Sequence, residues 1–293
     1  MNRNSFGLDL ACLAGPLEER LAAAEAAGFS QVMLWARDLA NHPRGYRAAL
    51  EQVHASRLRI TGLQLMRNYE GLSGPTHNHR LDVVKALLDM CTDVGAPLLL
   101  VRASATVDAQ FDPDRVEADL RKLANLAVPA GVRIGFKAIP WSHAVPDAAR
   151  AWDVVSRVNH ANLGLVLDAF HFIADGRPLD ALNEIRPDKI LLVQLADFGV
   201  PVFHELGQKT GDHLRVFPGD GVLQEQVAAF VRHIDWLGYD GDYSLLVFNE
   251  DYQALPAQAV AGFAARSAAW VNTQVLRRRL PLNRKGPDHD HLR

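Results

Sequence analysis

Three chemically capable side chains follow short apolar runs, where buried strands would be expected to end. Lys137 follows "RIGF", Asp168 follows "LGLVL", and Gln194 follows "KILLV". An isolated charge is costly to remove from water, so Asp168 needs a cation nearby. We therefore predict an ion pair between Lys137 and Asp168, which a separation of more than about 4 Å between their charged atoms would contradict. A lysine in this position could also be a general base or a Schiff-base nucleophile.

Further polar side chains follow the predicted strands and could complete a site. Besides Lys137, the candidates for acid–base chemistry are His171, His143 and His213. The candidates for substrate binding are Arg67, Arg102, Arg215, Gln194 and Trp141. Structural roles are open for the same residues, since Asp168 could cap a loop and His171 could bond a backbone carbonyl.

The elements that must position these residues alternate short apolar runs with amphipathic segments, a pattern typical of βαβ units around a parallel sheet. Eight strands are predicted, at residues 6–13, 31–36, 59–66, 97–104, 133–139, 163–170, 189–197 and 243–248. The clearest helices are predicted at residues 16–28, 78–95, 112–131 and 223–238. The pattern favours an α/β fold with a single (β/α)8 barrel over a doubly wound open sheet, because no GxGxxG motif follows the first strand.

Two segments depart from this repeat. Residues 198–221 form a long connection with five glycines after the seventh strand, on the side where active sites of such barrels are built, and are a candidate substrate loop. We expect the barrel to occupy residues 1–279 and a polar tail to occupy residues 280–293.

The composition is that of a globular protein and argues against several kinds of partner. Hydrophobic residues make up 48% of the 293 positions and charged residues 22%, enough for a large core. The net charge of -3 comes without a basic stripe for nucleic acid, and no apolar run is long enough to span a membrane. The two cysteines, Cys12 and Cys91, lack metal or redox spacing and favour a reduced, cytoplasmic setting. A small metabolite is the expected partner.

Four segments of the second half carry a resemblance to a known superfamily. They are "GLVLDAFHFIADG", "DKILLVQLADF", "HLRVFPGDG" and "LGYDGDYSLLVFNED". In this order they resemble the xylose-isomerase-like TIM barrels of the sugar phosphate isomerase/epimerase superfamily, and within it they are most similar to bacterial 3-dehydroshikimate dehydratases. The resemblance implies a divalent metal (Mn, Mg or Zn) held by four groups at the ends of strands five to eight, with a base that removes a proton beside a carbonyl. It also makes a homo-oligomer an open possibility.

Two of the four metal-ligand positions implied by the resemblance are substituted. Asp168 and Gln194 match, whereas Lys137 and Leu246 stand where the family carries glutamates. The exchange alters the local formal charge by about +3 and leaves one carboxylate and one amide, a poor site for a hard divalent cation. We therefore expect a degenerate metal site and no bound cofactor.

Three functions remain open at this point. The first is an isomerase/epimerase-like or dehydratase-like enzyme that acts on a small hydroxylated or carboxylated metabolite without metal. The second is a barrel that has lost catalysis and binds a metabolite as a regulatory module. The third is an ordinary metal-dependent isomerase or lyase with ligands recruited from His171, Asp197, Glu250 or Asp251.

Overall fold

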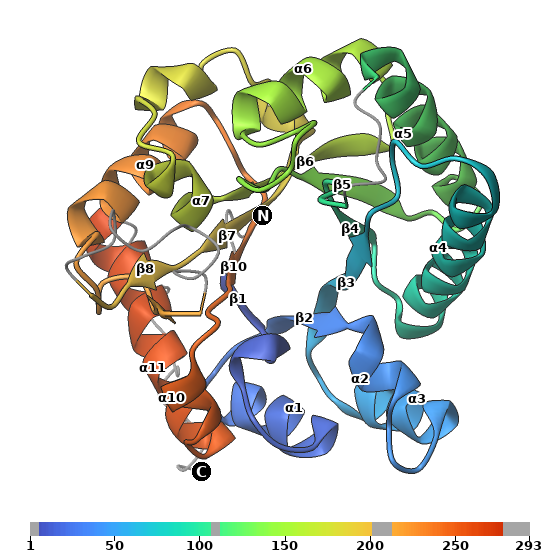
Figure 1. Ribbon diagram of the computed structural model, residues 1–293. Coiled ribbons are helices and arrows are strands. Elements are labelled where there is room, and N and C mark those ends of the chain that lie inside the picture. The colour runs from blue at the N-terminus through green and yellow to red at the C-terminus, as the bar shows by residue number, and fades with distance from the viewer. Residues whose placement is uncertain (1–5, 107–111, 201–212, 278–293) are drawn as a thin grey trace, which may run out of the picture.

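Eight parallel strands close into a barrel in the computed structural model, which describes residues 6–106, 112–200 and 213–277. The barrel strands are β1 Phe6–Asp9, β2 Gln31–Trp35, β3 Arg59–Arg67, β4 Leu98–Arg102, β5 Arg133–Lys137, β6 Leu163–Asp168, β7 Ile190–Leu195 and β10 Asp242–Leu245. Figure 1 shows them around the centre of the molecule, inside a layer of helices. Because β1 pairs with both β2 and β10, the sheet has no open edge. The predicted (β/α)8 barrel is confirmed, and the alternative of an open doubly wound sheet is wrong.

The strands are short and almost wholly buried, as expected for parallel strands covered on the outside by helices. β2 and β6 are buried along their whole length. A compact apolar cluster, separate from the larger core between strands and helices, comprises Met33, Leu98, Leu100, Val166 and Leu192. Side chains of this kind fill the interior of such barrels, so open space is left only at the ends.

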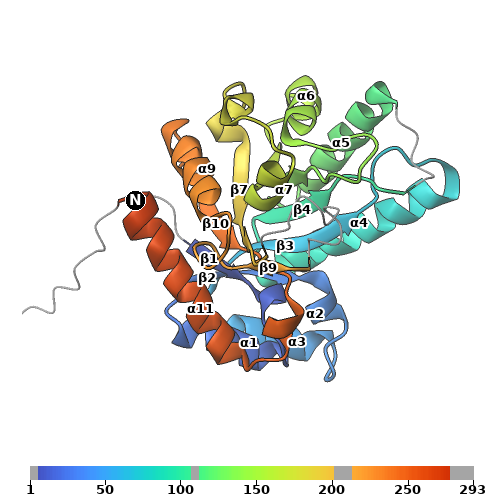
Figure 2. The ribbon, with the colours of Figure 1, turned by 60° about the vertical axis from the view of Figure 1, so that its left-hand side comes forward.

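Helices cover the outer face of the barrel, and all four predicted helices are found. The helices are α1 Leu17–Ala26, α2 Ala36–Ala40, α3 Tyr46–Ala55, α4 Gly74–Val94, α5 Pro113–Ala127, α6 Ala148–Val158, α7 Ala169–Ala174, α9 Gln224–Trp236, α10 Glu250–Gln253 and α11 Ala257–Trp270. The side chain of Asp112 caps α5 and that of Asp147 caps α6, which explains where these helices begin. α11 packs against α1 and so joins the two ends of the fold (Figure 2).

Several predicted strands continue too far, and the reason is local capping. The first strand ends at Asp9, whose side chain accepts a hydrogen bond from the amide of Ala11 at 3.0 Å and starts a 3-10 turn. The sixth strand ends at Asp168, whose carboxylate accepts from the amide of Phe170 at 3.0 Å and begins α7. Aspartate at a helix start satisfies amides that the helix itself cannot pair.

The long connection after β7 contains a small hairpin in its described part. β8 Asp197–Phe198 pairs antiparallel with β9 Arg215–Val216. Residues 201–212 of the predicted substrate loop and the predicted tail at 280–293 lie outside the described residues. No helix in the described ranges has the length and apolar character needed to cross a membrane. Cys12 and Cys91 are buried and free.

Candidate functional site

Strand register places three basic side chains in a row at the carboxyl end of the barrel. Arg67 on β3 is the Cα partner of Arg102 on β4, which is the partner of Lys137 on β5. Asp168 on β6 and Gln194 on β7 are partners in the same way. Because neighbouring strands lie about 4.8 Å apart, the row of three and the pair together bring five of the predicted site residues to one end of the barrel.

Lys137 lies between the carboxylate and the amide and makes the predicted ion pair. Its Nζ is 2.6 Å from Oδ2 of Asp168 and 2.6 Å from Oε1 of Gln194. The exposed fraction of the side chain is 8% for Lys137 and 2% for Asp168. The separation is well below 4 Å, so the predicted ion pair is confirmed. Two oxygen acceptors at this distance stabilise the buried ammonium.

Arg215 brings a second buried cation to Asp168. Its Nη1 lies 3.1 Å from Oδ2 and 3.3 Å from Oδ1 of Asp168, and its Nη2 lies 3.2 Å from Nε2 of His171. Since a guanidinium only donates hydrogen bonds, a neutral His171 accepts through Nε2, in the tautomer that has its proton on Nδ1. Arg215, predicted to bind substrate, is thus delivered by the β8–β9 hairpin to a carboxylate of the protein itself.

The neighbouring cations keep Asp168 ionised. Burial alone would raise the pKa of this carboxyl, but the charges of Arg215 and Lys137 hold its pKa well below the usual value. We call Lys137, Asp168, His171, Gln194 and Arg215 the ion cluster. In it one carboxylate faces two full positive charges, so the ion cluster carries a net charge of about +1 when His171 is neutral.

A cavity of about 530 Å³ adjoins the ion cluster, and we call it the mouth cavity. Its basic lining residues are Arg37, Arg67, Arg102, Lys137 and Arg215. Its aromatic lining residues are Trp35, Trp141 and Phe248. No aspartate or glutamate is among the described residues that line it. The described lining of the mouth cavity is therefore positively charged and partly aromatic.

Most of the predicted site residues line the mouth cavity. These are Arg67, Arg102, Lys137, Trp141, His171, His213 and Arg215, together with Leu246. Asp168 and Gln194 are buried and contact Lys137 from outside the lining. His143 is exposed and does not line the cavity, although its neighbours Ser142 and Ala144 are buried.

Sequence reasoning missed Asp9, a fully buried carboxyl next to the mouth cavity. It accepts hydrogen bonds from Nε1 of Trp35 at 3.0 Å and from Nε2 of Gln64, and both donors line the cavity. Burial raises the pKa of Asp9 to about 7, partly offset by these hydrogen bonds and the charge of Lys137. Asp9 could have been recognised as a carboxylate that follows an apolar run. The first predicted strand, at residues 6–13, instead places Asp9 in the middle of the strand and not at its end.

Glu70 is a second buried carboxyl that ties neighbouring loops together. Its Oε1 accepts from the amide of Ser104, and the hydroxyl of Ser104 donates to the carbonyl of Glu70 at 2.7 Å. Burial raises its pKa to about 7 as well. Since Glu70 follows β3 and Ser104 follows β4, the pair joins the segments that follow Arg67 and Arg102 at the strand ends.

The donor set does not fit a divalent metal. Nζ of Lys137 lies where a cation would contact Asp168 and Gln194, and Leu246 supplies no donor atom. Among the described residues, no group of three or more histidine, cysteine, aspartate or glutamate side chains could hold a metal ion.

Of the alternative ligands named from sequence, His171 lies at the site, where it contacts Arg215, and the other three lie elsewhere. The carboxylate of Asp197 accepts from the amides of Phe198 at 2.7 Å, Leu223 at 2.8 Å and Gly219 at 3.2 Å, and so holds the loop before α9. Glu250 and Asp251 are exposed at the start of α10 and do not line the mouth cavity.

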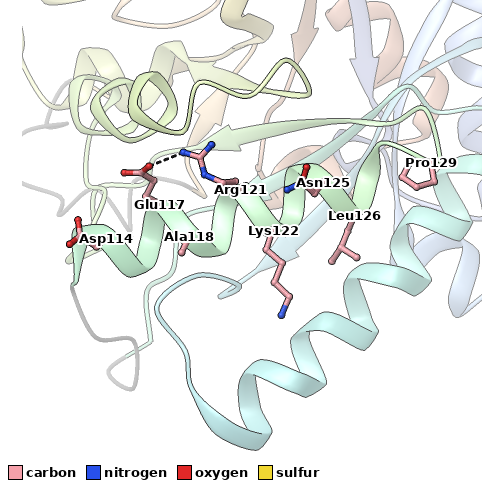
Figure 3. A pocket seen from close by; sticks show the side chains of 8 residues that line it. All are labelled: Asp114, Glu117, Ala118, Arg121, Lys122, Asn125, Leu126 and Pro129. Atoms are coloured by element: carbon pink, nitrogen blue, oxygen red, sulfur yellow. Dashed lines mark hydrogen bonds and ion pairs between the residues drawn. The ribbon is translucent and has the colours of Figure 1, made fainter.

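A second hollow, of about 690 Å³, lies on the outside of α5 (Figure 3). Its lining includes Asp114, Lys122 and an ion pair between Arg121 and Glu117 at 2.8 Å. It is formed by one helix face and contains none of the predicted site residues. The chemistry is therefore expected at the barrel mouth.

The fold and the strand-end site define a class of protein. The chain belongs to the xylose isomerase-like TIM barrel family, whose family description matches residues 21–271. It is 34% identical over 260 residues to a 3-dehydroshikimate dehydratase of Pseudomonas aeruginosa. The alignment covers 88% of this chain and 40% of that dehydratase.

Solved structures agree with this assignment. A xylose isomerase-like TIM barrel/4-hydroxyphenylpyruvate dioxygenase fusion protein superposes with a TM-score of 0.86 at 30% identity, over 94% of this chain and 44% of the other. An IOLI protein with a bound zinc atom superposes with a TM-score of 0.80 at 21% identity, over 92% and 99%, and shows the shared fold. The chain spans about 40% of the length of the two Pseudomonas dehydratases it matches.

Proposed function

We propose that the mouth cavity binds a small carboxylate-bearing metabolite and that the barrel carries out proton-transfer chemistry on it without a divalent metal. The observation that carries this proposal is the position of Nζ of Lys137, which lies 2.6 Å from Oδ2 of Asp168 and 2.6 Å from Oε1 of Gln194. The similarity to 3-dehydroshikimate dehydratases supports a dehydratase-like or isomerase-like reaction on a hydroxylated ring acid.

The charge of the mouth cavity supports an anionic ligand. Five basic side chains line it, and none of its described lining residues is acidic. Burial raises the pKa values of the two buried carboxyls near it, Asp9 and Glu70, to about 7, so each carries less than a full negative charge near neutral pH. A ligand carboxylate would relieve the repulsion between the cations.

The ion cluster provides groups for acid–base chemistry. The ammonium of Lys137 can stabilise negative charge that develops on a carbonyl oxygen beside it. His171 is the other acid–base candidate in the ion cluster, and its Nε2 lies 3.2 Å from Nη2 of Arg215. A ligand carboxylate that accepts the Arg215 hydrogen bond in place of His171 would leave Nε2 of His171 able to accept a proton from the ligand.

Binding without turnover is the second candidate, and one observation favours it. Within the ion cluster, Asp168, Gln194 and Nε2 of His171 are each engaged by Lys137 or Arg215. A site whose reactive groups form hydrogen bonds and ion pairs with one another is stable without a ligand. A ligand must displace these internal contacts before the groups can react with it. This is the arrangement expected if the barrel keeps its pocket as a binding module.

The test is to incubate the protein with 3-dehydroshikimate, in EDTA and separately with Mn²⁺, Mg²⁺ or Zn²⁺, and to follow loss of water by mass spectrometry. Turnover that persists in EDTA and is lost in Lys137→Met and His171→Gln would support metal-free catalysis. Turnover that requires an added metal would overturn it. Calorimetric binding of the acid without turnover would select the binding module, and absence of binding would exclude both functions.

Arg215→Gln tests the anion site, with Arg186→Gln as a matched control. Arg186 is exposed and precedes β7, at the opposite end of the barrel, where it pairs with Asp188 at 2.7 Å. We expect Arg215→Gln to weaken carboxylate binding by at least about tenfold, and Arg186→Gln to leave it unchanged.

A further inference from the structure

The backbone that carries Arg215 is held between β8 and the residues that follow β10. On the β8 side, β9 pairs with β8, and the amide of Gly199 donates to the carbonyl of Leu214 at 3.2 Å. On the other side, Leu214 and Asn249 form an antiparallel bridge. The amide of Arg215 itself donates to the carbonyl of Phe248 at 3.3 Å. The position of Arg215 therefore depends on the segment after β10 as well as on β8.

The side chain of Arg215 is fixed at its other end by the ion cluster. Its exposed fraction is 1%, and its Cζ lies 4.1 Å from the centre of the Phe170 ring. The guanidinium contacts Asp168 and His171. A planar guanidinium recognises a carboxylate through hydrogen bonds of defined direction, so a shift of the backbone would misalign it.

Asn249 joins the backbone of Arg215 to α10 through the two ends of its side-chain amide. Oδ1 accepts from the amides of Asp251 at 2.9 Å and Tyr252 at 3.2 Å, and so caps the start of α10. Nδ2 donates to the carbonyl of Arg215 at 2.8 Å. Because the two backbone amides require an acceptor, the NH₂ group of Asn249 must face Arg215.

α10 adds little to the core but contacts the segment that carries Arg215. It has four residues, and all of them are exposed or half-buried. A helix with so little buried surface stabilises the core weakly. The ring of Tyr252 stacks on that of Phe217, two residues after Arg215, with 5.3 Å between the ring centres. The cap and the stacking together attach α10 to this segment.

We infer that Asn249 is a positioning residue for the anion site: its Nδ2 donor fixes the backbone of Arg215 and so places the guanidinium where a ligand carboxylate would bind. This inference rests on the proposed anion-binding function. Asn249 acts through Arg215, because its amide contacts the backbone of Arg215 and lies outside the described lining of the mouth cavity.

Two variants separate the two roles of the Asn249 amide. Serine caps a helix about as well as asparagine, so Asn249→Ser keeps the cap of α10 but lacks the NH₂ group that donates to Arg215. Asn249→Ala removes both the cap and the donor. Asn162→Ser is a matched control. Asn162 is half-buried, precedes β6 at the opposite end of the barrel, and donates through Nδ2 to the carbonyl of Val132 at 2.5 Å.

Calorimetry with 3-dehydroshikimate as the probe measures the effect on the site. We expect Asn249→Ser and Asn249→Ala to weaken binding by about fivefold each, and Asn162→Ser to stay within about twofold of wild type. In the Arg215→Gln background, Asn249→Ser should change the affinity by less than about twofold, because Asn249 acts through Arg215. Wild-type affinity in Asn249→Ser, a loss in Asn249→Ala alone, or an equal loss in both backgrounds would overturn the inference.

A measurement without ligand distinguishes failure of this inference from failure of the proposed function. The coupling between Arg215 and Asp168 is obtained from urea unfolding of Arg215→Gln, Asp168→Asn and their double variant, in the wild-type and Asn249→Ser backgrounds. We expect the coupling in Asn249→Ser to be less than about half of its wild-type value. An unchanged coupling would overturn the positioning role even if no ligand binds. If the coupling falls but the wild-type protein does not bind 3-dehydroshikimate, Asn249 positions Arg215 and the proposed function fails.

Discussion

The coupling between Lys137 and Asp168 can be measured as a free energy of unfolding. In Asp168→Asn, Lys137 and Arg215 remain buried beside a neutral amide, and we expect a loss of about 3–5 kcal/mol. In Lys137→Met, Asp168 keeps Arg215 at 3.1 Å, so the loss should be smaller, about 1–3 kcal/mol. The double variant should be more stable than the sum of these losses predicts, by about 2 kcal/mol.

The assay is urea unfolding of the four proteins at pH 7.5, with a surface ion pair as reference. Arg121 and Glu117 lie one turn apart on α5, 2.8 Å from each other, with side chains 46% and 27% exposed (Figure 3). Their coupling, measured with Arg121→Met and Glu117→Gln, should be about 0.3–0.5 kcal/mol. The contrast isolates the effect of burial, because both pairs are in direct contact.

A coupling for Lys137 and Asp168 no larger than that of the surface pair would refute the reasoning. It would mean that Arg215 alone neutralises Asp168 and that Lys137 is available for other chemistry. Equal slopes of free energy against urea concentration across the four proteins are needed for the comparison, since a changed slope signals a changed unfolded state.

Two further predictions follow from the same region. Lys137→Glu combined with Leu246→Glu should create a site that binds about one Mn²⁺ per chain, measured by calorimetry. Leu246→Glu alone should not bind Mn²⁺, because the Lys137 ammonium remains. A double variant that folds but binds no Mn²⁺ would contradict this prediction. Burial raises the pKa of Asp9 from 3.8 to about 7, so between these pH values the folded protein holds a proton that the unfolded chain releases. The contribution of this proton to the free energy of unfolding is fully present below about pH 4 and is lost as the pH rises through 7. Asp9→Asn should therefore gain about 4 kcal/mol relative to wild type between pH 4 and pH 8 in urea unfolding, and a difference independent of pH would exclude a raised pKa.

Much of the fold followed from local pattern, because eight apolar runs separated by amphipathic segments leave few arrangements that bury every strand. The partner of Lys137 could also be predicted, since Asp168 ends the neighbouring strand and a buried carboxylate requires a cation.

The contacts of Arg215 could not be predicted in the same way. Its position depends on the β8–β9 hairpin, in which each strand has only two residues. Strands this short produce no apolar periodicity in the sequence. Asp9 was missed for a related reason: the run after it stays apolar, and only the 3-10 turn at Leu10–Cys12 shows that the strand has ended.

The position of Lys137 also determines how the cation reaches the site. A dissociable metal fills its site according to its free concentration and affinity, and is lost by dilution or chelation. The Lys137 ammonium is tethered to β5, so its effective concentration at Asp168 and Gln194 is fixed by the fold. The position between Asp168 and Gln194 is thus filled by a side chain of the protein when the chain folds, in every molecule alike.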